Sequence, residues 1–357
     1  MNFNLEFYAG KRVLITGHTG FKGTWLSVML VNAGAHVIGY SSCSTKEVRL
    51  FDLCRVADQI THIRGDVRNL PLLLEVFQSY RPEIVIHMAA QPIVRKSYTI
   101  PVQTYETNVL GTVNVLECVR QSSTVRSFLN VTTDKVYLNK GWDWGYREND
   151  ILDGYDPYSN SKSCSELVTR SYRRSFFPDG RVAISTARAG NVIGGGDFAQ
   201  DRIIPDCVRA AVRGESIKVR NPFSTRPYQH VLDPLYAYLM IAARQFEEGR
   251  FASHYNVGPD DNDCFQTCVL VDLFVKYWGG NLKWVSCSGE GPHEANFLKL
   301  DCSRLRSVFG WRPHWNLETA IKMAVQWSKV WIKGDDIRSC MDCQIGHFLE
   351  SGEEQRI

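Results

Sequence analysis

The chain has 357 residues, of which 44% are hydrophobic types and 22% are charged, so it suits one large globular domain or two lobes. A formal net charge of +3 is too small to indicate a nucleic-acid partner, and no run of about 18 apolar residues predicts a membrane span. The start of the chain lacks a signal-peptide pattern and eleven cysteines are scattered along it, which predicts a cytoplasmic protein with reduced thiols.

A glycine-rich stretch stands between the first predicted strand and the first predicted helix. The apolar residues 13–15 precede it, and a helix is expected over residues 24–31. Glycines at three-residue spacing allow a tight turn, a close approach of backbone to a pyrophosphate, and close packing of helix on strand. The helix N-terminus adds unpaired N–H groups that favour phosphate. The stretch predicts a dinucleotide site made by Gly17, His18, Gly20, Phe21, Lys22 and Gly23.

The first half of the chain alternates strands with helices. Further strands are expected over residues 36–40, 60–64, 84–88, 127–131 and 181–188, and helices over residues 70–79, 107–120 and 158–174. This rhythm predicts an α/β fold with a doubly wound parallel (Rossmann) sheet, in which ligands bind at the carboxyl ends of the strands. The residues expected at that edge are Asp66, Ala89, Ala90, Gln91, Thr132, Thr133 and Asn191.

The rhythm changes after residue 188, and the glycines at 194–196 predict a flexible break. Beyond it, helices are expected over residues 203–212, 265–277 and 317–331, and strands over residues 217–220 and 282–285. These elements predict a smaller mixed α/β lobe that contacts the substrate. We therefore expect a Rossmann domain over residues 1–190, a substrate lobe over 191–340 with crossings back to the first, and a polar tail over 341–357.

Tyr158 and Lys162 stand four residues apart on a predicted helix, so they share one face. A lysine ammonium near a phenol favours the phenolate and lowers the pKa of the phenol, which makes a base for an alcohol proton. With the glycine-rich loop upstream and Thr133 after a strand, the pair resembles the short-chain dehydrogenase/reductase superfamily. The resemblance implies that Tyr158 is the general base, that Lys162 holds the ribose and tunes Tyr158, and that Thr133 binds the reacting hydroxyl.

Longer motifs narrow the resemblance to the CDP-glucose 4,6-dehydratases. They read GHTGFKGTW at residues 17–25, TDKVY at 133–137, WDWGYREND at 142–150 and RPYQHVLD at 226–233. The resemblance implies a lyase in which hydride moves from carbon 4 of the sugar to NAD, water is lost across carbons 5 and 6, and hydride returns to carbon 6. The substrate implied is a nucleotide-sugar.

The elimination needs an acid for the departing hydroxyl and a base for the proton on carbon 5. The resemblance places Asp134 as the acid and Lys135 in the position of the base, where related thymidine-nucleotide dehydratases carry Asp-Glu. An aspartate must hold a proton to act as an acid. A lysine must be neutral to act as a base, and otherwise its cation stabilises the enolate. The sequence leaves both roles open for Lys135.

Other functions fit parts of the sequence. A nucleotide-sugar 4-epimerase would use the same Tyr158 and cofactor, but epimerisation requires no acid–base pair such as Asp134 and Lys135. A dehydratase for a different nucleotide-sugar also fits, because the choice of base rests on resemblance alone. A non-catalytic NAD-binding scaffold would not need Thr133, Tyr158 and Lys162 together.

NAD is the expected cofactor by resemblance, although no acidic residue closes the second strand. Such an acid binds both ribose hydroxyls, whereas residues 39–43 read GYSSC. Serines there, with Lys46 and Arg49 nearby, also suit a 2′-phosphate, so the residues themselves leave NAD and NADP open. By resemblance Asp66 and Val67 contact the adenine, or Asp66 instead caps the next helix. The other cofactor contacts expected are Ala89, Ala90, Gln91, Thr132, Tyr158 and Lys162.

The diphosphate of a nucleotide-sugar needs cations, and arginine forks suit it. The substrate contacts expected are Thr133, Asn191, Arg202, Arg220, Arg226 and His230. Cys340, Cys343 and His347 lack an evident fourth ligand, so no metal is expected.

A homo-oligomer is expected from the two helices over residues 107–120 and 158–174. Val109, Val113 and Leu116 give the first an apolar stripe. By resemblance the two helices pair across a two-fold axis into a four-helix bundle, which makes a homodimer or a dimer of dimers.

Overall fold

The computed structural model describes residues 3–42, 49–287 and 297–354. Its largest sheet has seven parallel strands in the order β11-β6-β5-β4-β1-β2-β3. The strands are β1 (Arg12–Thr16), β2 (His36–Ser41), β3 (Thr61–Arg64), β4 (Ile84–His87), β5 (Ser127–Thr133), β6 (Ala183–Ala189) and β11 (His254–Val257). The order reverses between β1 and β4, which is the switch point where such sheets bind ligands. The doubly wound parallel sheet predicted from the sequence is confirmed.

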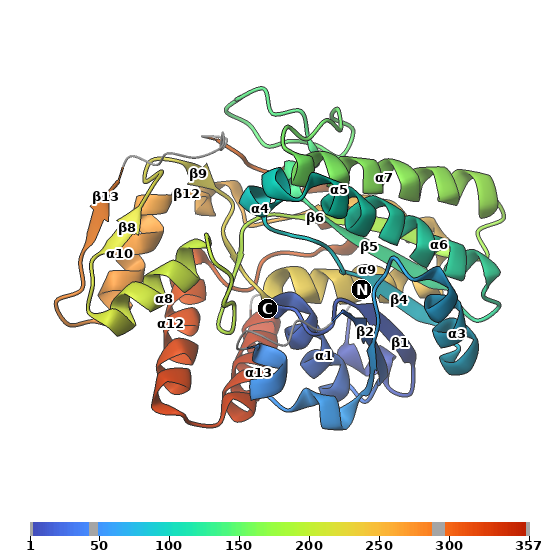
Figure 1. The fold of residues 1–357 in the computed structure, drawn as a ribbon, viewed down its shortest axis with the longest axis horizontal. Helices are drawn as coiled ribbons and strands as arrows, with labels where there is room; N and C mark the ends of the chain where they lie inside the picture. Colours follow the sequence, from blue (N-terminus) through green and yellow to red (C-terminus); the bar gives the residue numbers. More distant parts are fainter. Residues whose placement is uncertain (1–2, 43–48, 288–296, 355–357) are drawn as a thin grey trace.

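Helices cover both faces of this sheet (Figure 1). One face is covered by α1 (Phe21–Asn32), α9 (Leu232–Glu247) and α13 (Ile337–Glu354), and the other by α3 (Leu70–Tyr80), α6 (Gly111–Gln121) and α7 (Pro157–Phe176). Successive strand residues point to opposite faces, so Ile15 joins the first apolar layer and Leu14 the second. Because both faces are covered, each of these strands except β3 is buried along most of its length.

A smaller lobe, on the left in Figure 1, lies beside the carboxyl edge of the sheet. It contains α8 (Ile203–Arg213), α10 (Thr267–Trp278), α12 (Leu317–Lys333) and the parallel pair β8 (Ile217–Val219) and β13 (Trp284–Ser286). Phe274 and Ile321 are buried in the separate apolar core of this lobe. Its elements lie close to their predicted bounds.

The remaining short elements connect these layers. They are η1 (Leu5–Tyr8), α2 (Leu50–Leu53), η2 (Val56–Gln59), α4 (Val94–Thr99), α5 (Pro101–Tyr105), η3 (Glu106–Leu110), η4 (Asp134–Val136), β7 (Val192–Ile193), β9 (Thr225–Arg226), β10 (Gln229–His230), η5 (Gly249–Phe251), η6 (Asp261–Asp263), β12 (Phe265–Gln266) and α11 (Ser303–Phe309). The long helix expected over residues 107–120 is a continuous run from α5 through η3 to α6, with one π-helical segment at η3.

Two segments differ from the sequence-based expectation. Most of the expected tail is helix α13, which buries Met341 and Phe348 in the main core. Its apolar residues recur at helical spacing. The polar residues between them led to the prediction of a polar tail. The glycines at 194–196 are closely packed: Trp25 Nε1 donates to the Gly195 carbonyl oxygen (2.9 Å), and a Cβ on Gly195 would overlap the Trp327 ring.

Candidate active site

The glycine-rich loop lies at the switch point, against the loop that follows β4. Gly17 has φ of +79°, and a Cβ there would lie 2.8 Å from the Ala89 nitrogen. A Cβ on Gly23 would overlap the Gly17 carbonyl oxygen. Gly20 is the N-cap of α1 and carries no side chain, so the first N–H groups of the helix remain open to a phosphate. The glycines therefore form a cradle that larger residues would fill.

Other residues expected at the cofactor are held by protein contacts. His18 is buried, and its Nε2 lies 2.7 Å from His62 Nδ1. Asp66 forms an ion pair with Arg68 (2.8 Å), while the N-cap of α3 is Asn69. The alternative in which Asp66 caps that helix is therefore wrong. Contacts of His18 and Asp66 with a dinucleotide stay predictions.

Residues that follow or end β2 and β4 also contact other side chains of the protein. Ser41 Oγ lies 2.8 Å from Thr19 Oγ1. Arg49 forms an ion pair with Asp52 (2.8 Å), and Lys46 lies outside the described residues. The side chain of Gln91 is buried and donates to Thr104 Oγ1 (3.1 Å), which fixes the loop after β4.

Tyr158 is positioned by the N-terminus of α7, where Asp156 and Pro157 are residue types that favour the start of a helix. Asp156 is the N-cap of α7, its carboxylate accepting from the Ser159 N–H (3.0 Å), and Pro157 occupies the first turn. Tyr158 therefore sits in that turn, at the carboxyl edge of the sheet. Lys162, one turn later, is buried and donates from Nζ to the Val131 carbonyl oxygen (3.1 Å).

The ionisation of this pair differs from the expectation. Burial raises the pKa of Tyr158 to about 12, whereas its hydrogen bond with Thr133 and the charge of Arg202 lower it. The pKa of Tyr158 is therefore raised where the sequence predicted a lowered one, because desolvation outweighs the hydrogen bond with Thr133 and the charge of Arg202. Burial also lowers the pKa of Lys162 to about 8, and the charge of Glu166 opposes that change.

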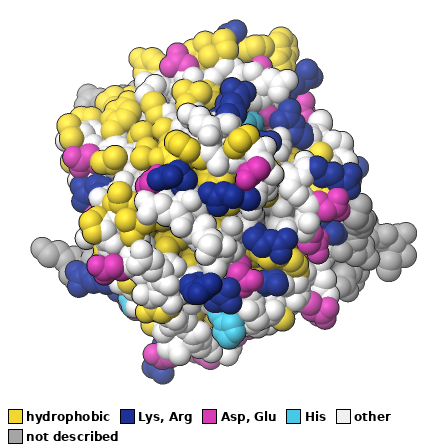
Figure 2. Space-filling model, turned by 90° about the vertical axis from the view of Figure 1, so that its right-hand side faces the viewer, with side chains coloured by type: hydrophobic (Ala, Val, Ile, Leu, Met, Phe, Trp, Pro, Cys, Tyr) yellow, Lys and Arg dark blue, Asp and Glu magenta, His cyan; other side chains and the backbone are white. Residues whose placement is uncertain are grey.

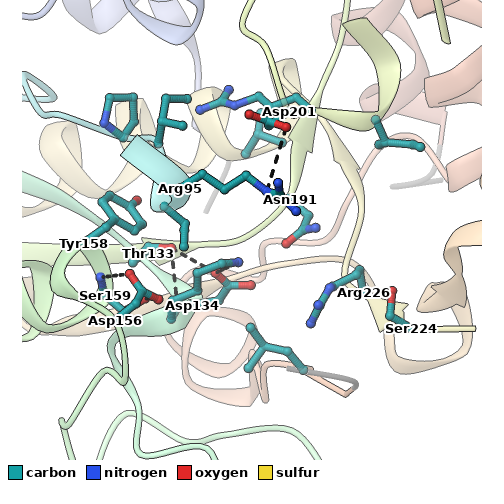
Figure 3. Close-up of a pocket in the computed structure, with 18 of the residues that line it drawn as sticks. Arg95, Thr133, Asp134, Asp156, Tyr158, Ser159, Asn191, Asp201, Ser224 and Arg226 are labelled. Carbon is teal, nitrogen blue, oxygen red and sulfur yellow. Dashed lines mark hydrogen bonds and ion pairs between the residues drawn. The ribbon is translucent and has the colours of Figure 1, made fainter. Parts of the chain in front are cut away.

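Thr133, Asp134 and Lys135 follow one another where β5 ends. Thr133 Oγ1 donates to Asp134 Oδ1 (2.9 Å), and Lys135 Nζ lies 3.9 Å from the same oxygen. Asp134 is 1% exposed, and its Oδ2 has no hydrogen-bond partner among the described residues. A Cβ at Gly190 would overlap that oxygen, so glycine there makes room for the carboxylate. Figure 3 shows Thr133, Asp134 and Tyr158 grouped at one end of the cleft.

A cleft of about 1110 Å³ runs from this group to the smaller lobe. The predicted site residues that line it are Phe21, Lys22, Thr132, Thr133, Asp134, Lys135, Tyr158, Asn191, Arg202, Arg220 and Arg226. His230 is fully buried instead, its ring centroid 4.7 Å from that of Trp315. Burial lowers the pKa of His230 to about 3. Its expected substrate contact gains no support from this placement.

Two charged residues that line the cleft, Arg95 and Asp201, were not expected from the sequence. Arg95 of α4 lies 3.8 Å from Asp201, which also pairs with Arg220 (2.7 Å). Arg226 points into the open part of the cleft (Figure 3). The available signal for Arg95 was its place just after the β4 end, since loops at that edge carry ligand contacts. Asn191 Oδ1 is buried without a hydrogen-bond partner among the described residues.

The described residues offer neither a metal site nor a membrane-spanning helix. No group of three or more His, Cys, Asp or Glu side chains in residues 3–42, 49–287 and 297–354 is arranged to hold a metal ion. Across the same ranges, every helix is too short or too polar to cross a bilayer.

Nearly the whole chain is similar in sequence to known nucleotide-sugar 4,6-dehydratases. A sequence model of the family described as GDP-mannose 4,6 dehydratase matches residues 14–324. A CDP-glucose 4,6-dehydratase of Salmonella typhimurium is 45% identical over 97% of this chain and 98% of its own length. A dTDP-glucose 4,6-dehydratase of Xanthomonas campestris is 27% identical over 90% of this chain and 95% of its own length.

Solved structures share the fold at lower identity. The dTDP-glucose 4,6-dehydratase of Bacillus anthracis, in complex with NAD, has a TM-score of 0.75 at 21% identity, covering 90% of this chain and 97% of its own. The UDP-glucose 4-epimerase of Thermotoga maritima, with UDP-glucose, has a TM-score of 0.79 at 21% identity, covering 90% of this chain and 99% of its own. With the family match and the 45% identical relative, the chain belongs to the GDP-mannose 4,6-dehydratase family.

Proposed function

We propose that this chain is a lyase that dehydrates CDP-glucose to CDP-4-keto-6-deoxyglucose through transient hydride transfer to bound NAD. The observation that carries the proposal is the buried Asp134, with Lys135 beside it, at the same cleft end as Thr133 and Tyr158. A 4-epimerase needs the tyrosine and the cofactor but no such acid–base pair. The relative that is 45% identical and named CDP-glucose 4,6-dehydratase supports the choice of substrate.

The residues present fit a dinucleotide. The cradle of Gly17, Gly20 and Gly23 and the N-terminus of α1 would hold the pyrophosphate. Tyr158 and Lys162 would hold the nicotinamide ribose. Bound NAD would supply a hydride acceptor that becomes the donor later in the same turnover.

The protein groups then divide the proton transfers. Thr133 orients the hydroxyl on carbon 4, and Tyr158 takes its proton as the hydride leaves that carbon. The resulting ketone acidifies the hydrogen on carbon 5. Lys135 either removes this proton as a base or, as a cation, stabilises the enolate that forms. Asp134 gives its proton to the hydroxyl that leaves carbon 6. Lys135 Nζ and Asp134 Oδ1, 3.9 Å apart, suit adjacent carbons.

The far part of the cleft suits the nucleoside diphosphate. Arg220 and Arg226 place two guanidinium groups along its wall, and Arg202, whose charge also acts on Tyr158, lines the cleft nearer its catalytic end. Asp197 holds Arg202 (2.9 Å) and Asp201 holds Arg220 (2.7 Å), which fixes the two side chains before substrate binds.

The experiment that tests the function is mass spectrometry of products from a panel of nucleotide-sugars with enzyme and NAD. We expect CDP-glucose to lose one water, with no stoichiometric consumption of NAD because oxidation and reduction cancel. A product of unchanged mass would support the epimerase instead, and a faster reaction of another nucleotide-sugar would reassign the substrate.

We also propose a homodimer or dimer of dimers, and a cytoplasmic location in keeping with the free cysteines found among the described residues. Apolar side chains gather on the upper part of the face in Figure 2, the end at which Figure 1 places α5, α6 and α7. Val102, Leu110 and Leu167 are exposed on η3 and these helices. Leu116, expected in this stripe, is instead buried against the sheet.

Light scattering at micromolar concentration should therefore give at least twice the monomer mass. Val102→Glu with Leu110→Glu should shift the protein toward monomer, because a charge in an apolar interface is costly to bury. Val285→Glu, at an exposed apolar residue of the smaller lobe, is the matched control. A monomer mass for the unmodified chain would refute the oligomer.

A further inference from the structure

Arg95 reaches across the cleft from α4 to the opposite wall. It is the second residue of α4, a helix that packs against α7, which carries Tyr158. Its side chain lines the cleft and points toward Asp201 and Asn191 (Figure 3). Asp201 stands just before α8 of the smaller lobe. The guanidinium of Arg95 is thus held between the two walls of the cleft.

Two guanidinium groups converge there on one oxygen of Asp201. Arg220 donates from Nη1 to Asp201 Oδ1 (2.7 Å), and Arg95 Nε lies 3.8 Å from the same oxygen. The longer distance exceeds that of a hydrogen bond. Accordingly, Arg95 Nε is buried and has no hydrogen-bond partner among the residues that the structure describes. One carboxylate therefore faces two cations, and one buried N–H group is left to donate to another anion.

The position of Arg95 along the cleft indicates which part of a substrate it meets. Thr133 and Tyr158 lie at one end of the cleft, Ser224 and Arg226 lie at the other, and Arg95 lies between them (Figure 3). A nucleotide-sugar with its sugar at Tyr158 and its nucleoside in the smaller lobe has its diphosphate between these ends. Because Arg95 extends from the wall that carries Tyr158, the phosphate nearer to it is the one bonded to the sugar.

We propose that Arg95 is a substrate-binding residue whose guanidinium donates to the phosphate that carries the sugar. Asp201 is the counter-ion of Arg95 and Arg220 in the free protein, and a phosphate oxygen accepts from the Arg95 Nε–H when substrate binds. The diphosphate is then bound from both walls, by Arg95 on the α4 side and by Arg220 and Arg226 on the side of the smaller lobe. The inference rests on the nucleotide-sugar substrate proposed above.

Isothermal titration calorimetry of the NAD-loaded enzyme with CDP and with CMP tests the assignment, because the two ligands differ by that phosphate. Arg95→Gln should weaken CDP binding by roughly ten- to a hundredfold, the scale of one lost hydrogen bond to a charged group. It should leave CMP binding nearly unchanged. Arg95→Lys should keep part of the affinity for CDP, because it retains the charge but loses the planar fork of donors.

Lys96→Gln is the matched control. Lys96 is the next cation of α4, but its side chain is exposed and does not line the cleft, so both affinities should stay unchanged. With CDP-glucose, Arg95→Gln should raise KM more than it lowers kcat, because Thr133 and Tyr158 are intact. An unchanged midpoint of urea denaturation would show that Arg95→Gln is folded.

The outcomes separate this assignment from the proposed function. Equal losses of CDP and CMP affinity in Arg95→Gln, or no loss of either, overturn the assignment of Arg95. If a different nucleotide-sugar reacts in the product panel, its own diphosphate and monophosphate serve as the two ligands, with the same expected results. A wild-type enzyme that releases no product lighter by one water refutes the dehydratase, whatever Arg95 binds.

Discussion

Lys135→Met should oxidise its substrate but stall before dehydration. Thr133 and Tyr158, which carry the first step, are unchanged, and only the amine 3.9 Å from Asp134 Oδ1 is lost. We expect dehydration to slow by ~10²–10⁴-fold, the usual contribution of a general base. Reduced nicotinamide should then accumulate on the enzyme with a bound 4-keto sugar. Stopped-flow absorbance of the nicotinamide measures both phases.

Three companion variants make the result specific. Tyr158→Phe should suppress the first oxidation, so that no reduced nicotinamide builds up. Lys140→Met is the matched control, since the Lys140 amine lies 4.8 Å from the Trp142 ring centroid and does not line the cleft. Lys135→Arg keeps a cation that cannot act as a base at neutral pH, so retained dehydration there favours the enolate-stabilising role. If Lys135→Met dehydrates at near wild-type rate, Lys135 is a bystander.

Glu166→Gln should lower the free energy of unfolding by about 3–5 kcal/mol, because it leaves the buried Arg188 without its counter-charge. Both side chains are 0% exposed, and Arg188 donates from Nη2 (2.8 Å) and Nε (3.0 Å) to the two Glu166 oxygens. Thr132 Oγ1 also donates to Glu166 (2.5 Å). The pair thus anchors α7, which carries Tyr158, to β6, and the Thr132 hydrogen bond also joins α7 to the end of β5.

Urea denaturation followed by circular dichroism measures the loss. The double variant Glu166→Gln/Arg188→Met should recover part of it, because no unpaired charge then remains. Glu318→Gln, which breaks the exposed pair with Lys276, is the control and should have a far smaller effect. An equal loss in Glu166→Gln and Glu318→Gln would contradict the expectation.

The same pair gives stability a dependence on acid pH. Burial alone raises the pKa of Glu166, but the charge and hydrogen bonds of Arg188 outweigh it and lower the pKa from 4.5 to about 2. The folded pKa lies below the unfolded one, so this stabilisation is complete above about pH 4.5 and is lost as the pH falls toward about 2. Glu166→Gln should flatten that part of the stability curve.

Local sequence signals predicted the parts of the site that a single turn or strand end makes. The glycine spacing predicted the tight turn at Gly17 and the close packing at Gly23, and the strand-end rule placed Thr133 at the cleft. The start of α7 is also set locally, by the Asp156 cap and the fixed φ of Pro157, although the predicted helix over residues 158–174 was placed without them. Each of these depends on neighbours along the chain.

Features that depend on packing between distant segments were missed or misplaced. Glu166 and Arg188 are ordinary charged residues in the sequence, and only the meeting of α7 with β6 makes them a buried pair. His230 lies in the motif at residues 226–233, from which a substrate contact was expected. Its ring instead packs against Trp25 of α1 and against Trp315, which precedes α12. The ionisation of Tyr158 was misjudged for the same reason, since the extent of its burial is set by the whole site.

The proposed reaction is tested most directly with CDP-glucose that carries deuterium on carbon 4. The hydride leaves that carbon, stays on the bound cofactor, and returns to carbon 6 of the same sugar. NMR and mass spectrometry of the product should therefore find deuterium on carbon 6, with one water lost and no stoichiometric change in NAD. Deuterium that remains on carbon 4, or that leaves the enzyme on free cofactor, would contradict the dehydratase mechanism.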